Sequence, residues 1–152
     1  MTTTVRVTKT RPKAQVPQYM TAGASGCDVT ACLEETLDIA PGARVAIPTG
    51  LKFEIPEGYE VQVRPRSGFA FKRGLTVVNA PGTIDSDYRG EVMVLAINLG
   101  QETVPVAHGD RVAQLVLQRV ERIEWVEASS LSESTRAEGG FGSTGFSSRA
   151  NS

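Results

Sequence analysis

The sequence is poor in the side chains that hold metals or activate nucleophiles. Its 152 residues include one histidine, His108, and two cysteines, Cys27 and Cys32. A structural zinc site takes four Cys or His ligands and is therefore excluded. A Ser-His-Asp triad would have to rest on His108, which stands in a turn-like stretch. The cysteines are five residues apart and would lie on opposite faces of a strand, which argues against a disulfide between them.

Long apolar runs and a large charge of one sign are also missing. No run approaches the roughly 18 residues of a membrane span, and the opening MTTTVRVTK has the features of neither a signal nor a transit peptide. The net charge of −1 offers no basic surface of the kind that duplex nucleic acid selects. We therefore expect a soluble protein of the cytoplasm, without membrane or nucleic-acid partners, in which local arginines can still bind an anion.

Short alternating segments separated by glycine and proline dominate the chain. The composition, 40% hydrophobic and 22% charged, is that of an ordinary globular domain, and the length suits one domain with a real core. Apolar and polar residues alternate in segments such as 4–9, 27–33, 51–55 and 59–64, with turn pairs between them. Short strands at spacings of about 8–12 residues predict an all-β sandwich or barrel.

Three segments depart from this alternation. Residues 67–74, SGFAFKRG, predict a short helix with Ser67 as its N-cap and Gly74 just after its end. Residues 91–98, EVMVLAIN, are apolar almost throughout, which predicts a strand covered on both faces, the second cover being another subunit. After residue 128 the chain becomes rich in Ser and Gly. We expect a β domain over residues 1–128 and a flexible C-terminal arm over residues 129–152.

A candidate anion site lies where an extended segment runs into the predicted helix. Arg64 and Arg66 are two residues apart, so they would share one face, and they lead directly into Ser67 and Gly68. Guanidinium groups, a hydroxyl and free backbone N–H groups are donors that phosphate accepts well. Taken alone, the segment is equally compatible with surface salt bridges and a plain helix cap.

A candidate hairpin, NAPGTIDSDYRGE (79–91), carries two acids and a tyrosine. Alternation places Asp85 and Asp87 on one face and Tyr88 on the other, unless the turn reorients it. A carboxylate at the tip of a hairpin can bind a metal or act as a general base toward water. The alternative is a solvated polar hairpin.

Two further segments complete the candidates. In GDRVAQLVLQ (109–118), Gln114 is polar among apolar neighbours, so its amide must find backbone partners or bind a ligand. Gly140 and Gly145 have the Walker spacing, but Phe146 stands where the lysine belongs, so a P-loop NTPase is rejected. A glycine-rich nest for an anion remains open, and Phe146 itself is unexplained.

Together these segments resemble the five motifs of the trimeric dUTP pyrophosphatases (dUTPases), in the family's order and at its usual spacings. The resemblance spans nearly the whole chain. It implies a distorted, jelly-roll-like β-barrel with one short helix and a flexible arm, assembled as a homotrimer whose three subunits share each active site. The matching segments are ASGCDVTA (24–31), RPRSGFA (64–70), NAPGTIDSDYRGE (79–91), GDRVAQL (109–115) and RAEGGFGSTG (136–145).

The family implies hydrolysis of dUTP to dUMP and pyrophosphate, which keeps uracil out of DNA and supplies dUMP for dTMP synthesis. Asp85 would be the catalytic base for the attacking water. Tyr88 would pack against the deoxyribose, and Phe141 would stack on uracil. Mg²⁺ would bind mainly through the substrate phosphates, with Asp28 contributing through water or steadying an arginine. The uracil edge would be read by Asn79, Thr83, Ile84 and Met93. The phosphates would be held by Arg66, Ser67, Gly68, Gln114, Arg136, Gly142, Ser143 and Thr144.

Two other readings stay open. A dCTP deaminase would share the fold and the trimer, but that family has Asp-Pro-Gly and a bulky aromatic in the hairpin and lacks the glycine-rich fifth motif. Here Asp85 is followed by Ser86-Asp87-Tyr88, and the fifth motif is complete. The second reading is a β module kept for protein binding without turnover. Departures from the dUTPase pattern are small: Phe69 stands where leucine is frequent, and Cys27 lies in the first motif.

Overall fold

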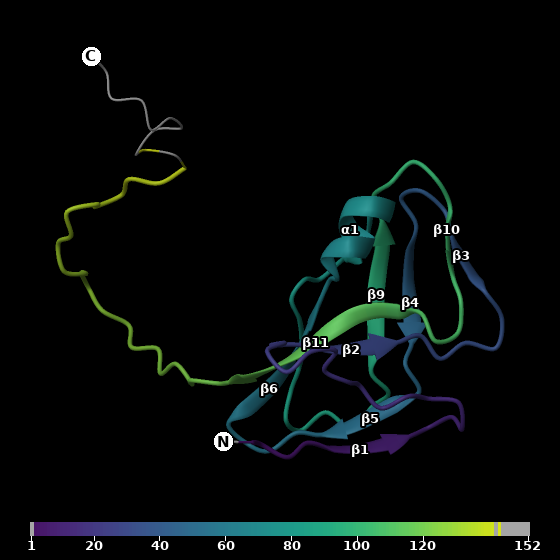
Figure 1. Ribbon diagram of the computed structural model, residues 1–152. Helices are drawn as coiled ribbons and strands as arrows, with labels where there is room; N and C mark the ends of the chain where they lie inside the picture. Colours follow the sequence, from purple (N-terminus) through teal and green to yellow (C-terminus); the bar gives the residue numbers. More distant parts are fainter. Residues whose placement is uncertain (1, 142, 144–152) are drawn as a thin grey trace. The chain divides into compact units, whose positions relative to one another are not determined.

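The structure, a computed structural model, describes residues 2–141 and 143, and it is mostly β with one short helix (Figure 1). The fold class predicted from alternation is confirmed at this level. The helix is α1 (Ser67–Arg73). The strands are β1 (Arg6–Lys9), β2 (Cys27–Thr30), β3 (Leu37–Ile39), β4 (Arg44–Pro48), β5 (Leu51–Glu54), β6 (Tyr59–Arg64), β7 (Leu75–Val77), β8 (Gly82–Ile84), β9 (Met93–Asn98), β10 (Val104–Val106) and β11 (Arg111–Arg119).

Within the described residues the strands form four separate antiparallel sheets. One sheet has the order β2-β11-β6-β8, a second has the order β4-β9-β7, and β1-β5 and β10-β3 form two-stranded sheets. A closed barrel requires every strand to pair on both sides, whereas β2, β8, β4 and β7 each pair on one side only. The expected closed barrel is therefore corrected to a set of sheets around a common core, and the homotrimer stays a prediction.

The chain divides into two compact units, Met1–Glu121 and Arg122–Ser152. The sequence placed this division later, after residue 128. Apolar residues continue past β11, but Ile123, Trp125 and Val126 are 68%, 86% and 80% exposed and belong to none of the described strands. The last described strand ends at Arg119, and the boundary after residue 128 stays a prediction.

The core is filled by alternate residues from different sheets. Val29, Ile39, Ile47, Leu51 and Val94 are each completely buried, and they come from five strands. Burying such a side chain contributes about 1.5–3 kcal/mol. Since the buried residues of the strands recur at every second position, the alternation seen in the sequence is what selects the face of each strand that turns inward.

Strand β9 is covered on one face by its own chain. Val94, Ala96 and Asn98 are buried, while Met93 and Leu95 are 36% and 41% exposed. One face of β9 is therefore partly open in the single chain, as it must be if the second cover comes from another subunit. A second subunit as the other cover remains a prediction.

Helix α1 is a short surface helix. Its C-terminal end agrees with the predicted Gly74, and its N-cap differs from the predicted Ser67. It ends at Gly74, which is left-handed (φ 71°) and donates its N–H to the Ala70 carbonyl at 3.1 Å. A Cβ at Gly74 would collide with the backbone of Gly100, so glycine is required there. The N-cap is Arg66 rather than Ser67, since Ser67 is already the first helical residue, and Arg66 makes no side-chain cap hydrogen bond.

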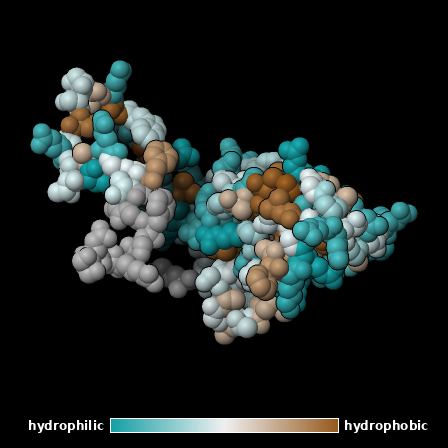
Figure 2. All heavy atoms as spheres, turned by 90° about the horizontal axis from the view of Figure 1, so that it is seen from above, coloured by the Kyte–Doolittle hydropathy of each residue, from teal (hydrophilic) through white to brown (hydrophobic). Residues whose placement is uncertain are grey.

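Exposed apolar side chains are scattered over the surface. Phe71 on α1 is 93% exposed and Leu99 is 69% exposed. Viewed from above (Figure 2), hydrophobic residues form patches among hydrophilic ones. No helix among the described residues is long and apolar enough to cross a lipid bilayer.

Asn98 is a completely buried polar residue that joins three segments. Its Nδ2 donates to the carbonyls of Ile39 at 2.8 Å and Glu102 at 2.7 Å, and its Oδ1 accepts from the Gly100 N–H at 2.8 Å. The Asn98 side chain therefore links β9 to β3 and to the loop before β10 through three hydrogen bonds.

We predict that Asn98→Leu lowers the free energy of unfolding by about 2–4 kcal/mol, because it leaves three backbone groups, the buried Ile39 carbonyl among them, without their partner. Urea unfolding at a fixed protein concentration measures this loss. The exposed neighbour provides the control: Leu99→Ala should change the free energy by less than about 0.5 kcal/mol. Equal effects of the two substitutions would contradict the role of Asn98.

Candidate functional site

A cavity of about 290 Å³ lies against β8, the turn that follows it and the start of β9. Strand β8 pairs with β6, and β9 pairs with β4 and β7 in another sheet, so residues 79–91 form a strand and a turn and not the two paired strands expected from the sequence. The name hairpin is kept below for the segment 79–91.

The cavity brings together six residues that the sequence proposed as a site, among them the predicted base and the predicted sugar-packing tyrosine. The six are Asn79, Thr83, Ile84, Asp85, Tyr88 and Met93, and the rest of the lining is Val63, Gly82, Glu91, Val92 and Leu95. The walls are therefore mixed, with an apolar floor and polar groups from one hairpin, as is typical of small-molecule sites.

The turn after β8 explains how Asp85 and Tyr88 reach the same cavity. Strand β8 ends at Ile84, and the Tyr88 N–H donates to the Asp85 carbonyl at 3.2 Å, which closes a turn over Ser86 and Asp87. The strand alternation expected through residue 88 is therefore corrected, since it stops where the turn begins. Asp85 and Tyr88 both line the cavity, and Asp87 does not.

Two glycines make room for site side chains. A Cβ at Gly82, which is buried between β6 and its own loop, would lie 3.2 Å from Asn79 Nδ2 and 3.2 Å from Val63 Cβ. A Cβ at Gly90 would collide with the hydroxyl and ring of Tyr88. The absence of these two side chains lets the Asn79 amide and the Tyr88 ring lie close to the hairpin backbone.

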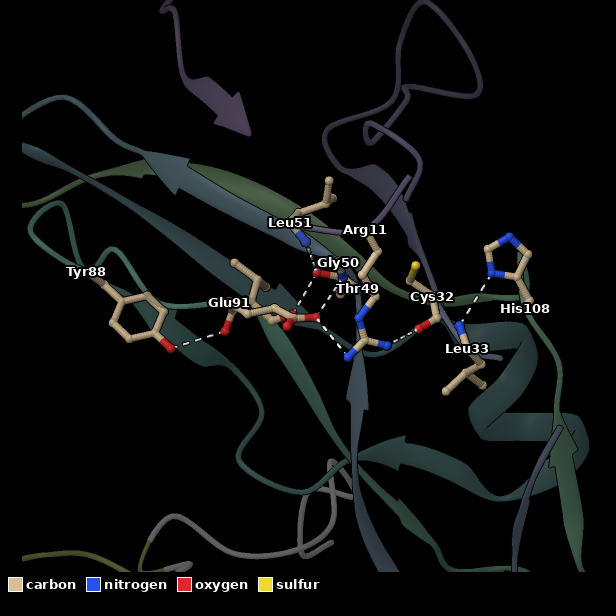
Figure 3. A network of polar contacts seen from close by, with 10 residues as sticks. Arg11, Cys32, Leu33, Thr49, Gly50, Leu51, Tyr88, Glu91 and His108 are labelled. Carbon is tan, nitrogen blue, oxygen red and sulfur yellow. Dashed lines mark hydrogen bonds and ion pairs between the residues drawn. The ribbon is translucent and has the colours of Figure 1, made fainter. Parts of the chain in front are cut away.

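The hydroxyl of Tyr88 is tethered to the backbone. It donates to the carbonyl of Glu91 at 3.1 Å, so the side chain turns back along the hairpin (Figure 3). Tyr88 is still 47% exposed, which leaves part of its ring free to contact a ligand. The cavity therefore has one aromatic wall that is both accessible and anchored.

A second cluster gathers around Asp28 on β2. Its Oδ1 is 3.2 Å from Arg66 Nε, and its Oδ2 accepts a hydrogen bond from Arg111 Nη1 at 3.0 Å. Arg66 Nη1 also donates to the Arg111 carbonyl at 3.1 Å. The Asp28 side chain is only 13% exposed, so its charge is balanced mainly by these two guanidinium groups. Arg64 does not join them, because it binds Gln62 Oε1 instead.

Gln114 on β11 lies between β2, which carries Asp28, and β6, which leads to Arg66. It stands opposite Asp28 on β2 and opposite Arg64 on β6. Its Nε2 donates to the Pro65 carbonyl at 3.1 Å, and a Cβ at Gly26 would lie 2.8 Å from its Oε1. The amide nitrogen carries two hydrogens, so the bond to the Pro65 carbonyl leaves one for another acceptor.

Ser67 and Gly68 are exposed at the start of α1, directly after Arg66. The cavity described above is lined by none of the residues proposed as phosphate or metal contacts in the β domain, which are Asp28, Arg66, Ser67, Gly68 and Gln114. The sequence-predicted residues of the β domain therefore form two groups in one chain: the hairpin cavity and the cluster around Asp28.

Next to Asp28, Cys27 is a half-buried free thiol. Burial is the main factor that raises the pKa of the Cys27 thiol, and Asp28 adds to the rise. A raised pKa keeps the thiol protonated and neutral at pH 7, so Cys27 adds no second negative charge beside Asp28. Cys32 is also free and is buried, in agreement with the expectation that the two cysteines do not pair.

The described residues do not form a metal cage of their own. No group of three or more His, Cys, Asp or Glu side chains is placed to hold an ion in this part of the chain. Asp28, the one carboxylate proposed near a metal, is already engaged by two arginines. Direct coordination by the protein alone therefore does not fit these residues, whereas a metal carried by a ligand would need no such cage.

The arm residues belong to the unit Arg122–Ser152. Within it, Arg136 Nε donates to the Gly139 carbonyl at 2.7 Å, and the Gly139 N–H donates to the Arg136 carbonyl at 3.0 Å. Phe141 is fully exposed with a positive φ of 48°, and Ser143 is exposed. Gly142, Thr144 and Phe146 lie outside the described residues.

Sequence reasoning missed two residues of these groups. Arg111 pairs with Asp28, although the sequence singled out only Gln114 in the same segment. Glu91 lines the cavity and receives the Tyr88 hydroxyl, but it stood in the hairpin motif without an assigned role. The available signal was a charged residue close to a glycine: Glu91 directly follows Gly90, and Arg111 lies two residues after Gly109.

Comparison with known proteins gives consistent matches over most of the chain. The family model described as dUTPase matches residues 12–145. The deoxyuridine 5'-triphosphate nucleotidohydrolase of Desulfotalea psychrophila is 58% identical over 130 residues, which cover 86% of this chain and 87% of the relative. That of Wolinella succinogenes is 51% identical over 143 residues, covering 94% and 95%. The Staphylococcus bacteriophage 80alpha dUTPase, solved with dUPNHPP, matches with a TM-score of 0.85 and 26% identity over 95% of this chain and all of that one.

We predict that Asp28→Asn lowers the free energy of unfolding by about 1–3 kcal/mol, because Arg66 and Arg111 then face each other without a carboxylate between them. Salt screens repulsion between charges, so the loss should shrink in 1 M NaCl, where the Debye length is about 3 Å. Urea unfolding at low and high salt measures both effects. Asp38→Asn, on the exposed side of β3, is the matched control. A loss for Asp28→Asn no larger than that of the control would contradict the charge-balancing role.

Proposed function

The chain belongs to the dUTPase family, and we propose that it is a dUTP diphosphatase, which hydrolyses dUTP to dUMP and pyrophosphate. The observation that carries the proposal is the cavity that Asn79, Asp85 and Tyr88 line together from the single segment 79–91. The relatives at 58% and 51% identity bear the name of this activity. Hydrolysis of dUTP would remove uracil nucleotides from the pool for DNA synthesis and supply dUMP for dTMP synthesis.

In this proposal the hairpin selects the base. Asn79 and the backbone of Thr83, Ile84 and Met93 read the uracil edge. A wrong donor or acceptor on cytosine would leave buried polar groups unpaired, which costs about 1–3 kcal/mol each. A methyl group is worth only about 1–3 kcal/mol in affinity, so thymine must be rejected by a rigid wall at C5. Backbone held in the β6–β8 pairing, with Val63 opposite Gly82, is suited to form such a wall.

The anchored ring of Tyr88 selects the sugar. Packed against the deoxyribose, it leaves no space for a 2′-hydroxyl, and its tether to Glu91 resists displacement. Asp85, from the same turn, takes the proton of a water molecule as the water oxygen attacks the α-phosphorus. The bond between the α-phosphorus and the bridging oxygen breaks, and pyrophosphate leaves with its electron pair.

The cluster around Asp28 supplies the phosphate contacts. Arg66, Ser67, Gly68 and the remaining amide hydrogen of Gln114 are the proposed donors, and Asp28 keeps Arg66 in place through the 3.2 Å ion pair. Mg²⁺ bound to the triphosphate of the substrate would supply charge neutralisation for the pyrophosphate leaving group. The lack of a carboxylate cage among the described residues is compatible with a metal delivered in this way.

A homotrimer with shared sites would unite the two groups. The hairpin cavity and the Asp28 cluster have no lining residue in common within one chain, and the outward face of β9 offers Met93 and Leu95 at the cavity wall. One subunit would supply the hairpin, a second the cluster, and a third the arm. The arm would close over the substrate, with Arg136, Gly142, Ser143 and Thr144 on the phosphates and Phe141 on the base. The cytoplasmic location stays a prediction.

We predict that the purified protein with Mg²⁺ releases pyrophosphate from dUTP. At the same nucleotide concentration, the rate of pyrophosphate release from dCTP, dTTP and UTP should be much lower. Pyrophosphate and ammonia are measured in parallel. Ammonia from dCTP would assign the chain to the deaminases instead, and absence of turnover with all four nucleotides would favour a binding module.

We predict that Asp85→Asn retains affinity for dUTP and lowers kcat by about 10²–10⁴-fold, because the amide preserves shape but cannot accept the water proton. Steady-state kinetics and titration with a non-hydrolysable dUTP analogue separate the two quantities. Asp87→Asn is the matched control: it neutralises an acid in the same turn that does not line the cavity, and it should keep kcat within about twofold. A near-wild-type kcat for Asp85→Asn would rule out its role as the base.

A further inference from the structure

Glu91 connects the cavity to the interior through two different groups. Its backbone carbonyl accepts the hydrogen bond of the Tyr88 hydroxyl at 3.1 Å. Its carboxylate points the other way: Oε1 accepts from the Gly50 N–H at 2.9 Å and lies 4.0 Å from Arg11 Nη2. Figure 3 shows this arrangement, with Tyr88 on one side of Glu91 and Gly50 and Arg11 on the other. The Glu91 side chain is only 25% exposed, so its charge depends on these partners.

The inner partner, Gly50, is a fixed point. It is buried and left-handed, with φ +69°, and a Cβ there would lie 2.8 Å from Ala14 Cβ and 3.0 Å from Cys32 Sγ. The Gly50 carbonyl accepts from the Thr10 N–H at 2.8 Å, while Arg11 Nη1 donates to the Cys32 carbonyl at 2.9 Å. The N–H that the Glu91 carboxylate binds is therefore held by packing and by the N-terminal segment.

The peptide group between Glu91 and Val92 is held from the same side. The Val92 N–H, which belongs to this group, donates to the Leu51 carbonyl at 2.8 Å, and the Val92 carbonyl, in the next peptide group, accepts from Thr49 Oγ1 at 2.6 Å. Because the Glu91 carbonyl belongs to this planar peptide group, its direction is set by the turn Thr49–Leu51. The carboxylate of Glu91 adds a second attachment to that turn, at Gly50.

The outer partner, Tyr88, has little else to hold it. It is 47% exposed, and the hydroxyl bond to Glu91 is its one side-chain hydrogen bond among the described residues. The ring lies across the backbone of Gly90, where no Cβ pushes it away. Its position at the cavity wall therefore depends on where the Glu91 carbonyl points.

From these contacts we propose that Glu91 is a positioning residue for the sugar-selecting ring of Tyr88. The Glu91 carboxylate attaches the segment 79–91 to the Gly50 N–H, and this attachment fixes the Glu91 carbonyl that binds the Tyr88 hydroxyl. The Tyr88 ring then occupies the space that a 2′-hydroxyl would need. This rests on the proposed function of the cavity. Glu91 touches no reacting atom, and its effect appears as selectivity between deoxyribose and ribose rather than as loss of chemistry alone.

The test compares kcat/KM for dUTP and for UTP in four forms of the full chain: wild type, Glu91→Ala, Glu91→Gln and Tyr88→Phe. Glu91→Ala removes the attachment to Gly50. It should lower the ratio of kcat/KM for dUTP to kcat/KM for UTP about tenfold, which is the effect of one hydrogen bond to a charged group. Glu91→Gln is the matched control, since its amide oxygen still accepts from Gly50, and it should stay within about threefold of wild type. Tyr88→Phe removes only the hydroxyl and should narrow the ratio as Glu91→Ala does.

The double variant Glu91→Ala/Tyr88→Phe should lose no more selectivity than either single variant, because both changes act through one bond. A parallel fall of kcat/KM for both nucleotides, with the ratio unchanged, would mean that Glu91 only stabilises the fold and would overturn the proposal. Tyr88→Phe tests the same bond at an exposed side chain if Glu91→Ala fails to fold, and an unchanged ratio there would overturn the proposal as well. A wild-type protein that turns over neither nucleotide would overturn the proposed function together with this inference.

Discussion

The pairing of β11 with both β2 and β6 is the constraint on which the cluster around Asp28 depends. Antiparallel register places Gln114 opposite Asp28 on one neighbour and opposite Arg64 on the other. Segments that are about ninety and fifty residues apart in the chain are thus brought within hydrogen-bonding distance of each other. A shift of one residue in either register would turn Gln114 to the opposite face. The apolar neighbours Ala113 and Leu115, which are buried, oppose such a shift.

The hairpin cavity depends on a different device, the turn around Thr49–Leu51. Thr49 is completely buried, and its hydroxyl both donates to the Val92 carbonyl and accepts from the Leu51 N–H at 3.3 Å. This turn fixes the start of β9 without contributing a residue to the cavity lining. A binding wall made of backbone discriminates between bases only while the backbone does not move. The buried turn behind the hairpin provides that rigidity, and it frees Asp85 and Tyr88 to remain exposed.

Local patterns predicted what is local in this molecule. The alternation in residues 51–55 and 59–64 predicted β5 and β6, and Gly74 marked the end of α1, because burial and backbone conformation act within a few residues. The same patterns failed at the turn after Ile84, where period-two alternation stops, and at Arg66, which takes the cap position expected for Ser67. They also could not show that Glu91 binds Gly50, 41 residues away, or that Asp28 pairs with Arg111, 83 residues away. Such contacts depend on the register between strands that are distant in the sequence. The division into four sheets depends on which strand edges stay unpaired, and local patterns do not carry that information either.

The charges around Asp28 bear on the proposal that one subunit does not suffice for a triphosphate. One carboxylate shared by two guanidinium groups leaves a small excess of positive charge, and part of the Arg66 guanidinium is already used on the Arg111 backbone carbonyl. A triphosphate carries several negative charges that must be matched when water is excluded. Under the proposed function, the additional cations would be the metal carried by the substrate and Arg136 of the arm. Asp28 would then hold both arginines in the empty protein, and the anion site would be complete only with substrate and arm present. A glycine-rich arm suits this role, because it can wrap a phosphate with backbone N–H groups that need no charge balance in the empty protein.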